Sequence, residues 1–172
     1  ELLAGASWSD DPALGPLRRG SVARLVVGCE GTDVEVAWML EQLAADWRDQ
    51  GVTDITQVEP GAVDGLWQRL TEFTTAVDAP LVLKANMVPS ATTRFLQEIL
   101  RTFPDADVQA HAGNGIVLAR LAELTDSASR ALVSTLQPAA QAGGGNVEIL
   151  HFGEGLELTR QVIWGGVRSD FP

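Results

Sequence analysis

The amino-acid sequence predicts an α+β fold, and three observations lead to this prediction. The second half of the chain alternates short apolar runs with amphipathic helical segments in the order β-α-β-β-α-β. Its two middle runs, 107–112 and 115–121, are separated by Gly113-Asn114, a pair that favours the tight turn of a β-hairpin. No linker rich in proline or glycine divides the chain. We therefore expect one antiparallel or mixed sheet of the ferredoxin-like, split β-α-β type, with helices packed on one face.

The first half of the chain leads into this unit. Residues 1–21 mix glycine, proline and polar residues without periodicity, which predicts an irregular lead-in to a single domain over 22–172. A β-branched apolar run over 22–28 predicts a buried strand. Thr32 and Glu35 have the spacing of a capping box, so a helix should run from there to about residue 50. A strand over 54–58 and a helix that opens at Pro60 complete this half.

The second half contains the clearer signals. Residues 80–87 alternate as a strand, and Pro89-Ser90 opens a helix whose apolar residues fall on one side. After the hairpin, Asp126 or Ser127 is expected to cap a helix that ends at the glycine run 143–145. A last strand is expected over 147–152.

Composition excludes several classes of function. The chain has 23 acidic residues against 12 basic ones, a net charge of −11, whereas nucleic-acid binding depends on basic patches. No apolar run is long enough to cross a bilayer. The single cysteine, Cys29, excludes both an internal disulfide and a metal site built from several cysteines. We expect no nucleic-acid partner and no insertion into a membrane.

The first segment that could carry chemistry is the strand over 80–87. Alternation places Val82, Lys84 and Asn86 on one face of it, and Lys84 is the only lysine in the chain. An ammonium in an apolar strand is costly to bury unless it is paired. Either this face is solvated, or Lys84 points into a polar cleft where an anion could bind.

The second segment is the hairpin. His111 precedes the turn Gly113-Asn114-Gly115, and Arg120 lies on the returning strand. A Gly-Asn-Gly turn alone is a weak signal, and it lacks the third glycine and the helix of a dinucleotide-binding fingerprint. His111 is either a structural or surface histidine or, with Asn114, part of a cleft.

The third segment is the glycine-flanked last strand. His151 closes this strand before Gly153, a position where side chains often face a cleft. Both histidines of the chain therefore stand at strand ends beside glycine turns, which suggests a shared site. These motifs alone support an α+β domain with a cleft for an anionic ligand.

The same three segments, in this order and spacing, resemble the C-terminal cap domain of FAD-linked oxidases, and within that family the FAD-binding subunit of bacterial glycolate oxidase. The resemblance extends over most of residues 22–170. It is carried by Leu83-Lys84-Ala85-Asn86-Met87-Val88-Pro89-Ser90, by Ala110-His111-Ala112-Gly113-Asn114-Gly115 and by Val162-Ile163-Trp164-Gly165. The chain starts without methionine and stops at Pro172, so we expect both ends to be cuts and the family's flavin-binding domain to be absent from it.

The resemblance also bears on metal binding. Members of the family that hold a divalent metal have two histidines in the pattern His-x-Gly-Asp-Gly-Asn-x-His and a later glutamate before a histidine. His111 matches the first histidine, but Leu118 stands at the second and Leu150 at the glutamate, with His151 after it. Leucine has no donor atom, so we expect no metal.

The activity implied by the resemblance is oxidation of a 2-hydroxy acid, of the glycolate or D-lactate type, by FAD. His151 would be the catalytic base, and Lys84 and Arg120 would bind the substrate carboxylate. Lys84 matches a lysine of related enzymes only with a one-residue offset. The flavin would be held mainly by the missing domain, so the isolated chain should bind FAD weakly and be inactive.

The implied partners are the flavin-binding domain and other glycolate oxidase subunits. The expected location is the cytoplasm, either free or held at the inner membrane through those subunits. The alternative is a ferredoxin-like module without catalytic residues that binds a ligand or docks on a subunit.

Overall fold

The computed structural model of the 172-residue chain describes residues 1–5, 8, 14, 23–75, 79–122 and 125–153. Its six strands are β1 (Leu2–Ala4), β2 (Arg24–Leu25), β3 (Leu81–Asn86), β4 (Asp107–His111), β5 (Ile116–Leu121) and β6 (Asn146–Phe152). Its helices are α2 (Asp33–Asp49), α3 (Pro60–Thr71), α4 (Thr92–Thr102), α5 (Asp126–Ala131) and α6 (Gln137–Ala142), with a 3₁₀ turn at Pro89–Ala91 and a π-helical turn at Leu132–Leu136.

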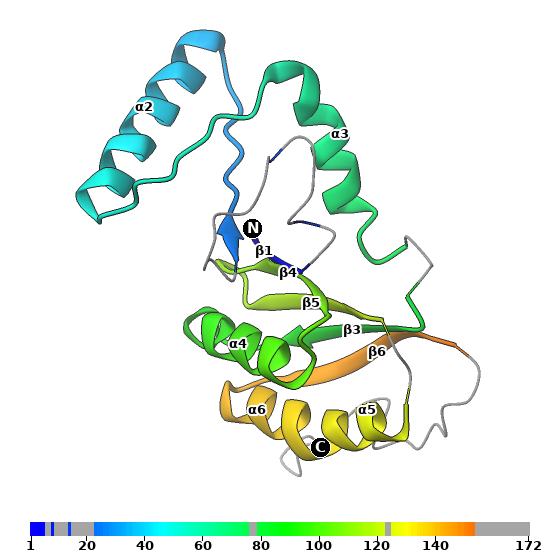
Figure 1. The fold of residues 1–172 in the computed structure, drawn as a ribbon. Coiled ribbons are helices and arrows are strands. Elements are labelled where there is room, and N and C mark those ends of the chain that lie inside the picture. Colours follow the sequence, from blue (N-terminus) through cyan, green and yellow to red (C-terminus); the bar gives the residue numbers. More distant parts are fainter. Residues whose placement is uncertain (6–7, 9–13, 15–22, 76–78, 123–124, 154–172) are drawn as a thin grey trace, which may run out of the picture.

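The strands form one sheet in the order β2-β1-β4-β5-β3-β6, and all neighbours are antiparallel. The last four strands and their helices follow the predicted β-α-β-β-α-β order, with β3 between β5 and β6. The prediction of an α+β, ferredoxin-like fold is therefore confirmed. β1 and β2 extend the sheet beyond β4 (Figure 1).

The main core lies between the sheet and the helices α4, α5 and α6. Along β3, the alternate residues Leu81, Leu83 and Ala85 are at most 2% exposed and pack in this core with Phe95 and Ile99 of α4. We call this side of the sheet the helical face. Figure 1 shows α4, α5 and α6 covering it, so alternation along the strand determines which residues enter the core.

The opposite side of the sheet, which we call the open face, carries a second, smaller apolar cluster. This second cluster packs Leu66 and Leu70 of α3 and Phe73 against Leu3 of β1 and Leu118 of β5. Figure 1 shows α2 and α3 on this side. The expectation that all helices pack on one face is therefore wrong for α3, because its apolar residues have their partners on the other face.

Three boundaries predicted for the first half are also wrong. Residues 2–4 of the supposed irregular lead-in form β1, which pairs with β4. The strand expected over 22–28 shrinks to the two residues of β2, and the one expected over 54–58 is not a strand. A strand this short has too few residues to show periodicity, and its existence depends on a partner strand far away in the sequence.

The helix boundaries are closer to the expectation. Thr32 and Glu35 form the predicted capping box of α2, in which the Thr32 backbone N–H donates to Glu35 Oε2 at 2.8 Å. The helix over 126–142 is capped by Thr125 rather than by Asp126 or Ser127, with the Ala128 N–H donating to Thr125 Oγ1. Its π-helical turn lies just before Pro138, a residue with no N–H for a regular helical hydrogen bond.

Candidate functional site

The candidate site lies on the open face, over the strands β3 and β6. Lys84 and Asn86 of β3 are half-buried, whereas Val82 beside them is 1% exposed. Lys84 stands opposite Leu118 of β5 on one side and opposite Glu148 of β6 on the other. The predicted placement of Val82, Lys84 and Asn86 on one face is confirmed by this register.

His151 reaches the same face through a β-bulge. Val82 pairs with His151 and Leu83 with Ile149, so Leu150 is an extra residue in β6. His151 comes three residues after Glu148, so in a regular strand their side chains would point to opposite faces. The extra residue reverses this alternation, so His151 and Glu148 are both on the open face.

Lys84, Arg120 and His151 therefore share one face of the sheet. From strand spacing and rise, their Cα atoms lie within about 10 Å of one another. Val82 stands between Arg120 and His151, because it is the direct partner of both.

Arg120, however, is engaged elsewhere. Its Nη2 donates to Asp107 Oδ2 of β4 at 3.1 Å, and both side chains are 18% exposed. Its guanidinium carbon lies 4.5 Å from the centre of the Phe73 ring, which stacks on Trp8. These contacts hold Arg120 toward β4 and the second cluster. Its contact with a substrate stays a prediction.

His111 and Asn114 lie away from Lys84, at the end of β4 and in the turn that follows it. The His111 Nδ1 is 2.7 Å from Glu1 Oε1, and the His111 side chain is 34% exposed. Asn114 is exposed in the turn, where its N–H donates to the His111 carbonyl. Three strand spacings and four residues separate His111 from His151, or about 19 Å between Cα atoms. The two histidines therefore do not share a site, and neither His111 nor Asn114 lines the face around Lys84.

The glycine turns have a structural explanation. A Cβ at Gly115, which has a φ of +71°, would lie 1.9 Å from the Met87 carbonyl oxygen. A Cβ at Gly145 would lie 1.5 Å from the carbonyl oxygen of Asn86. Both turns press against the end of β3, so only glycine fits there, and no ligand is needed to account for them.

The metal pattern finds no support in the described residues. They contain no group of three or more histidine, cysteine, aspartate or glutamate side chains that could hold a metal ion. Leu118 and Leu150 stand on β5 and β6, on either side of β3. The absence of a metal at His111 stays a prediction.

The described helix N-termini offer no good place for the phosphates of FAD. At α2 the Glu35 carboxylate already accepts from the Thr32 N–H, which is where an anion would bind. Helix α3 and the 3₁₀ turn before α4 each begin with a proline, which has no N–H. At α5 the Thr125 hydroxyl likewise accepts from the Ala128 N–H, so none of these helix N-termini fits the phosphate part of the cofactor.

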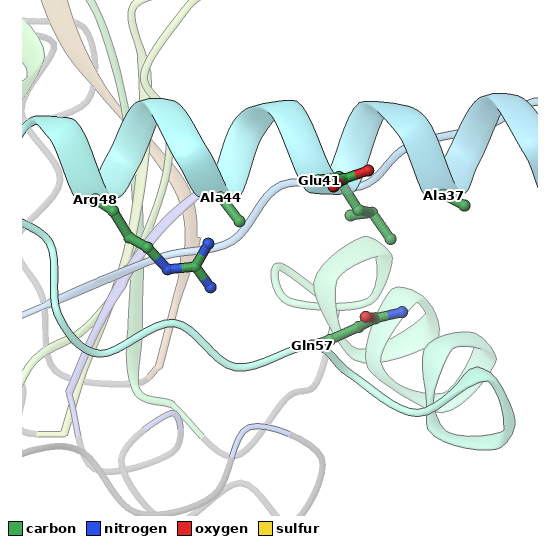
Figure 2. Close-up of a pocket in the computed structure, with 6 residues that line it drawn as sticks. Ala37, Glu41, Ala44, Arg48 and Gln57 are labelled. Atoms are coloured by element: carbon green, nitrogen blue, oxygen red, sulfur yellow. The ribbon is translucent and has the colours of Figure 1, made fainter.

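A separate hollow of about 330 Å³ lies beside α2. It is lined by Ala37, Leu40, Glu41, Ala44 and Arg48 of the helix and by Gln57 of the extended segment that follows. Figure 2 shows Arg48 and Gln57 reaching into the space between these two segments. None of its lining residues belongs to the sheet, so it is distinct from the site at Lys84 and His151.

No family model, no curated protein and no solved structure matches the chain. Among the described helices, none is both long and apolar enough to span a membrane.

Proposed function

We propose that the chain is the substrate-side cap domain of an FAD-linked 2-hydroxy-acid oxidase or dehydrogenase, of the type that oxidises glycolate or D-lactate. The observation that carries the proposal is that Lys84 of β3 and His151 of β6 lie on the same face of two neighbouring strands. The cap would close this face over a flavin held by a separate domain of the complete protein. The chain alone would be inactive.

Lys84 supplies the cation for the substrate carboxylate. Its side chain is half-buried, and no carboxylate of the described residues lies within 4.0 Å of its ammonium. An ammonium at a partly dry surface binds an anion more strongly than one in bulk water. This arrangement favours the polar cleft over the solvated face, the two alternatives that alternation left open.

His151 supplies the base. Oxidation of a 2-hydroxy acid removes the hydroxyl proton and a hydride from the α-carbon, leaving a 2-oxo acid. With the carboxylate on Lys84, the adjacent hydroxyl lies toward β6, where the His151 imidazole can take its proton. A bound flavin would accept the hydride.

The test uses the complete protein with its flavin. Mixing it with glycolate or D-lactate without oxygen should bleach the flavin absorbance. Lys84→Met should raise the KM by on the order of tenfold or more, because a charge-assisted contact is lost. His151→Asn should lower the kcat by about 10²- to 10⁴-fold, the usual contribution of a general base.

Arg94→Met is the matched control, because this exposed arginine stands on α4, on the other side of the sheet. It should leave both constants unchanged. A flavin that no 2-hydroxy acid bleaches, or Lys84 and His151 variants with normal constants, would contradict the proposal.

A second candidate is a docking module without catalytic residues. It is favoured by the exposure of large apolar side chains on α2 and α3, where Trp38 is 62% and Trp67 is 59% exposed. On this reading α2 and α3 bind another subunit, and Trp38→Ser with Trp67→Ser would weaken the complex without unfolding the chain. In both cases we expect the chain to work in the cytoplasm, free or attached to the inner membrane through its partner subunits.

A further inference from the structure

Glu148 stands at the centre of the candidate site, although nothing in the sequence singled it out. It is the direct cross-strand partner of Lys84, and both side chains are half-buried. The Cβ atoms of such partners lie about 5 Å apart, and opposite charges at these positions commonly form an ion pair. In the described residues, however, no ion pair within 4.0 Å includes Lys84 or Glu148.

Glu148 instead accepts a hydrogen bond along its own strand. Asn146 Nδ2 donates to Glu148 Oε1 at 3.1 Å. Asn146 is the partner of Asn86, one step further along the open face from Lys84. This hydrogen bond draws the carboxylate toward Asn146, and Lys84 has no carboxylate partner among the described residues.

The charges of the open face limit what that ligand can be. Arg120 forms an ion pair with Asp107. His111, at the end of β4, lies next to the Glu1 carboxylate. Lys84 is then the one described lysine or arginine over β3 and β6 that has no carboxylate partner, and the nearest fixed negative charge is Glu148. The described residues of this face can therefore compensate one negative charge of a ligand, and they repel a second.

The position of His151 sets where the rest of the ligand lies. With its carboxylate on Lys84 and its hydroxyl at His151, the α-carbon would lie between these two side chains, and Glu148 stands directly opposite Lys84 on β6. A substituent on that carbon therefore lies close to the Glu148 carboxylate.

We infer that Glu148 is the specificity-determining residue of the site and restricts it to 2-hydroxy acids with a single carboxylate. This inference rests on the proposed function. A dicarboxylic 2-hydroxy acid would bring its second carboxylate against Glu148 with no cation to compensate it. Asn146 acts as a positioning residue, because it keeps Glu148 from closing on Lys84.

The test measures binding without catalysis, in the complete flavin-loaded protein. The probes are 2-hydroxyisobutyrate, which has one carboxylate, and citramalate, which has two. Neither has a hydrogen on the α-carbon, so neither can be oxidised there. Titration calorimetry should give a dissociation constant for citramalate that is on the order of tenfold or more above that for 2-hydroxyisobutyrate.

Glu148→Gln should reduce this ratio by on the order of tenfold, since the amide keeps the side-chain size but removes the charge. Glu41→Gln makes the same charge change on exposed α2, away from the sheet, and should leave the ratio unchanged. A ratio that stays within about twofold of the wild-type value in Glu148→Gln would overturn the inference.

Asn146→Ala provides a second, independent variant. It releases Glu148 toward Lys84, so the dissociation constant of 2-hydroxyisobutyrate should rise by about three- to tenfold. The same substitution made in Glu148→Gln should have little effect, because no charge is left to release. An equal loss in both backgrounds would overturn the positioning role and show that Asn146 contacts the ligand itself.

The failure of the inference and that of the proposed function give different results. If glycolate and D-lactate bleach the flavin but both probes bind equally well, the specificity role of Glu148 is wrong and the oxidase proposal stands. If no 2-hydroxy acid bleaches the flavin and neither probe binds, the proposed function falls, and the inference falls with it.

Discussion

Residues 81–147 and residues 23–75 both carry apolar side chains at strand or helix spacing, but they bury them to very different degrees. Among the described residues, the main core has eighteen buried ones, and all but Ala4 belong to 81–147. The described residues 23–75 contribute only three buried side chains, those of Leu66, Leu70 and Phe73. Helix α2 has none, although its apolar residues recur at helical spacing.

Charge separates the two regions as well. Residues 23–75 contain ten acidic residues and three arginines, whereas the described residues of 79–153 contain five acidic and five basic ones. Most of the net negative charge therefore belongs to the region with the small core. A helix with an apolar stripe and no buried residue depends on its caps and on its own hydrogen bonds, because packing adds little. The comparison shows that helical periodicity predicts a helix without predicting a core.

The largest effect that would sharpen this comparison concerns a glycine of the ferredoxin-like unit. Gly145→Ala should destabilise the chain by roughly 3–5 kcal/mol, because the new Cβ meets the Asn86 carbonyl oxygen at 1.5 Å and the end of β3 must move. Urea unfolding followed by circular dichroism measures this change. Gly61→Ala in α3 is the control: nothing lies within 4 Å of its Cβ, so the variant should be neutral or stabilised by up to about 1 kcal/mol. Equal effects at the two positions would break the comparison.

A smaller effect is expected from removing leucine side chains. Leu136 is fully buried in the main core, so Leu136→Ala should cost about 2–5 kcal/mol of unfolding free energy. Leu40 of α2 is only half-buried, and Leu40→Ala should cost less than about 1 kcal/mol. Chemical denaturation of the two variants side by side provides the measurement. A cost at Leu40 that matches Leu136 would show that α2 has a packed partner and that the two regions share one core.

The smallest effect concerns the cap of α2. Hydrogen bonds from the Thr32 backbone N–H and then from its hydroxyl lower the pKa of Glu35 below its usual value. The ionised form is therefore the one that supports the helix: its stabilising effect is present above the unfolded-state pKa and is lost as the pH falls through the lowered folded-state pKa.

Carbon-13 NMR titration of the Glu35 carboxyl should show this lowered pKa. Thr32→Ala should raise it only partway, because the backbone hydrogen bond remains. A Glu35 pKa at the ordinary value of a glutamate would mean that the capping box does not form in solution.

The sequence by itself determined the elements whose signals are local. The alternation of 80–87, the Gly113-Asn114 pair and the capping box at Thr32 each depend on neighbours in the chain, and the structure has all three. The same local pattern placed Lys84 and Asn86 together on one face, because the side chains of a strand alternate whatever its partners are. The order β-α-β-β-α-β was enough to predict the ferredoxin-like unit.

Only the tertiary structure decided how the candidate site is composed. The strand order puts His111 far from His151. The pairing of β4 with β5 places Arg120 opposite Asp107, and the two form an ion pair. The extra residue Leu150 turns His151 to the face of Lys84 and Glu148, where simple alternation would have put it on the other side. Strand order, register and bulges arise from pairings between segments distant in the sequence, and a local pattern carries no information about them.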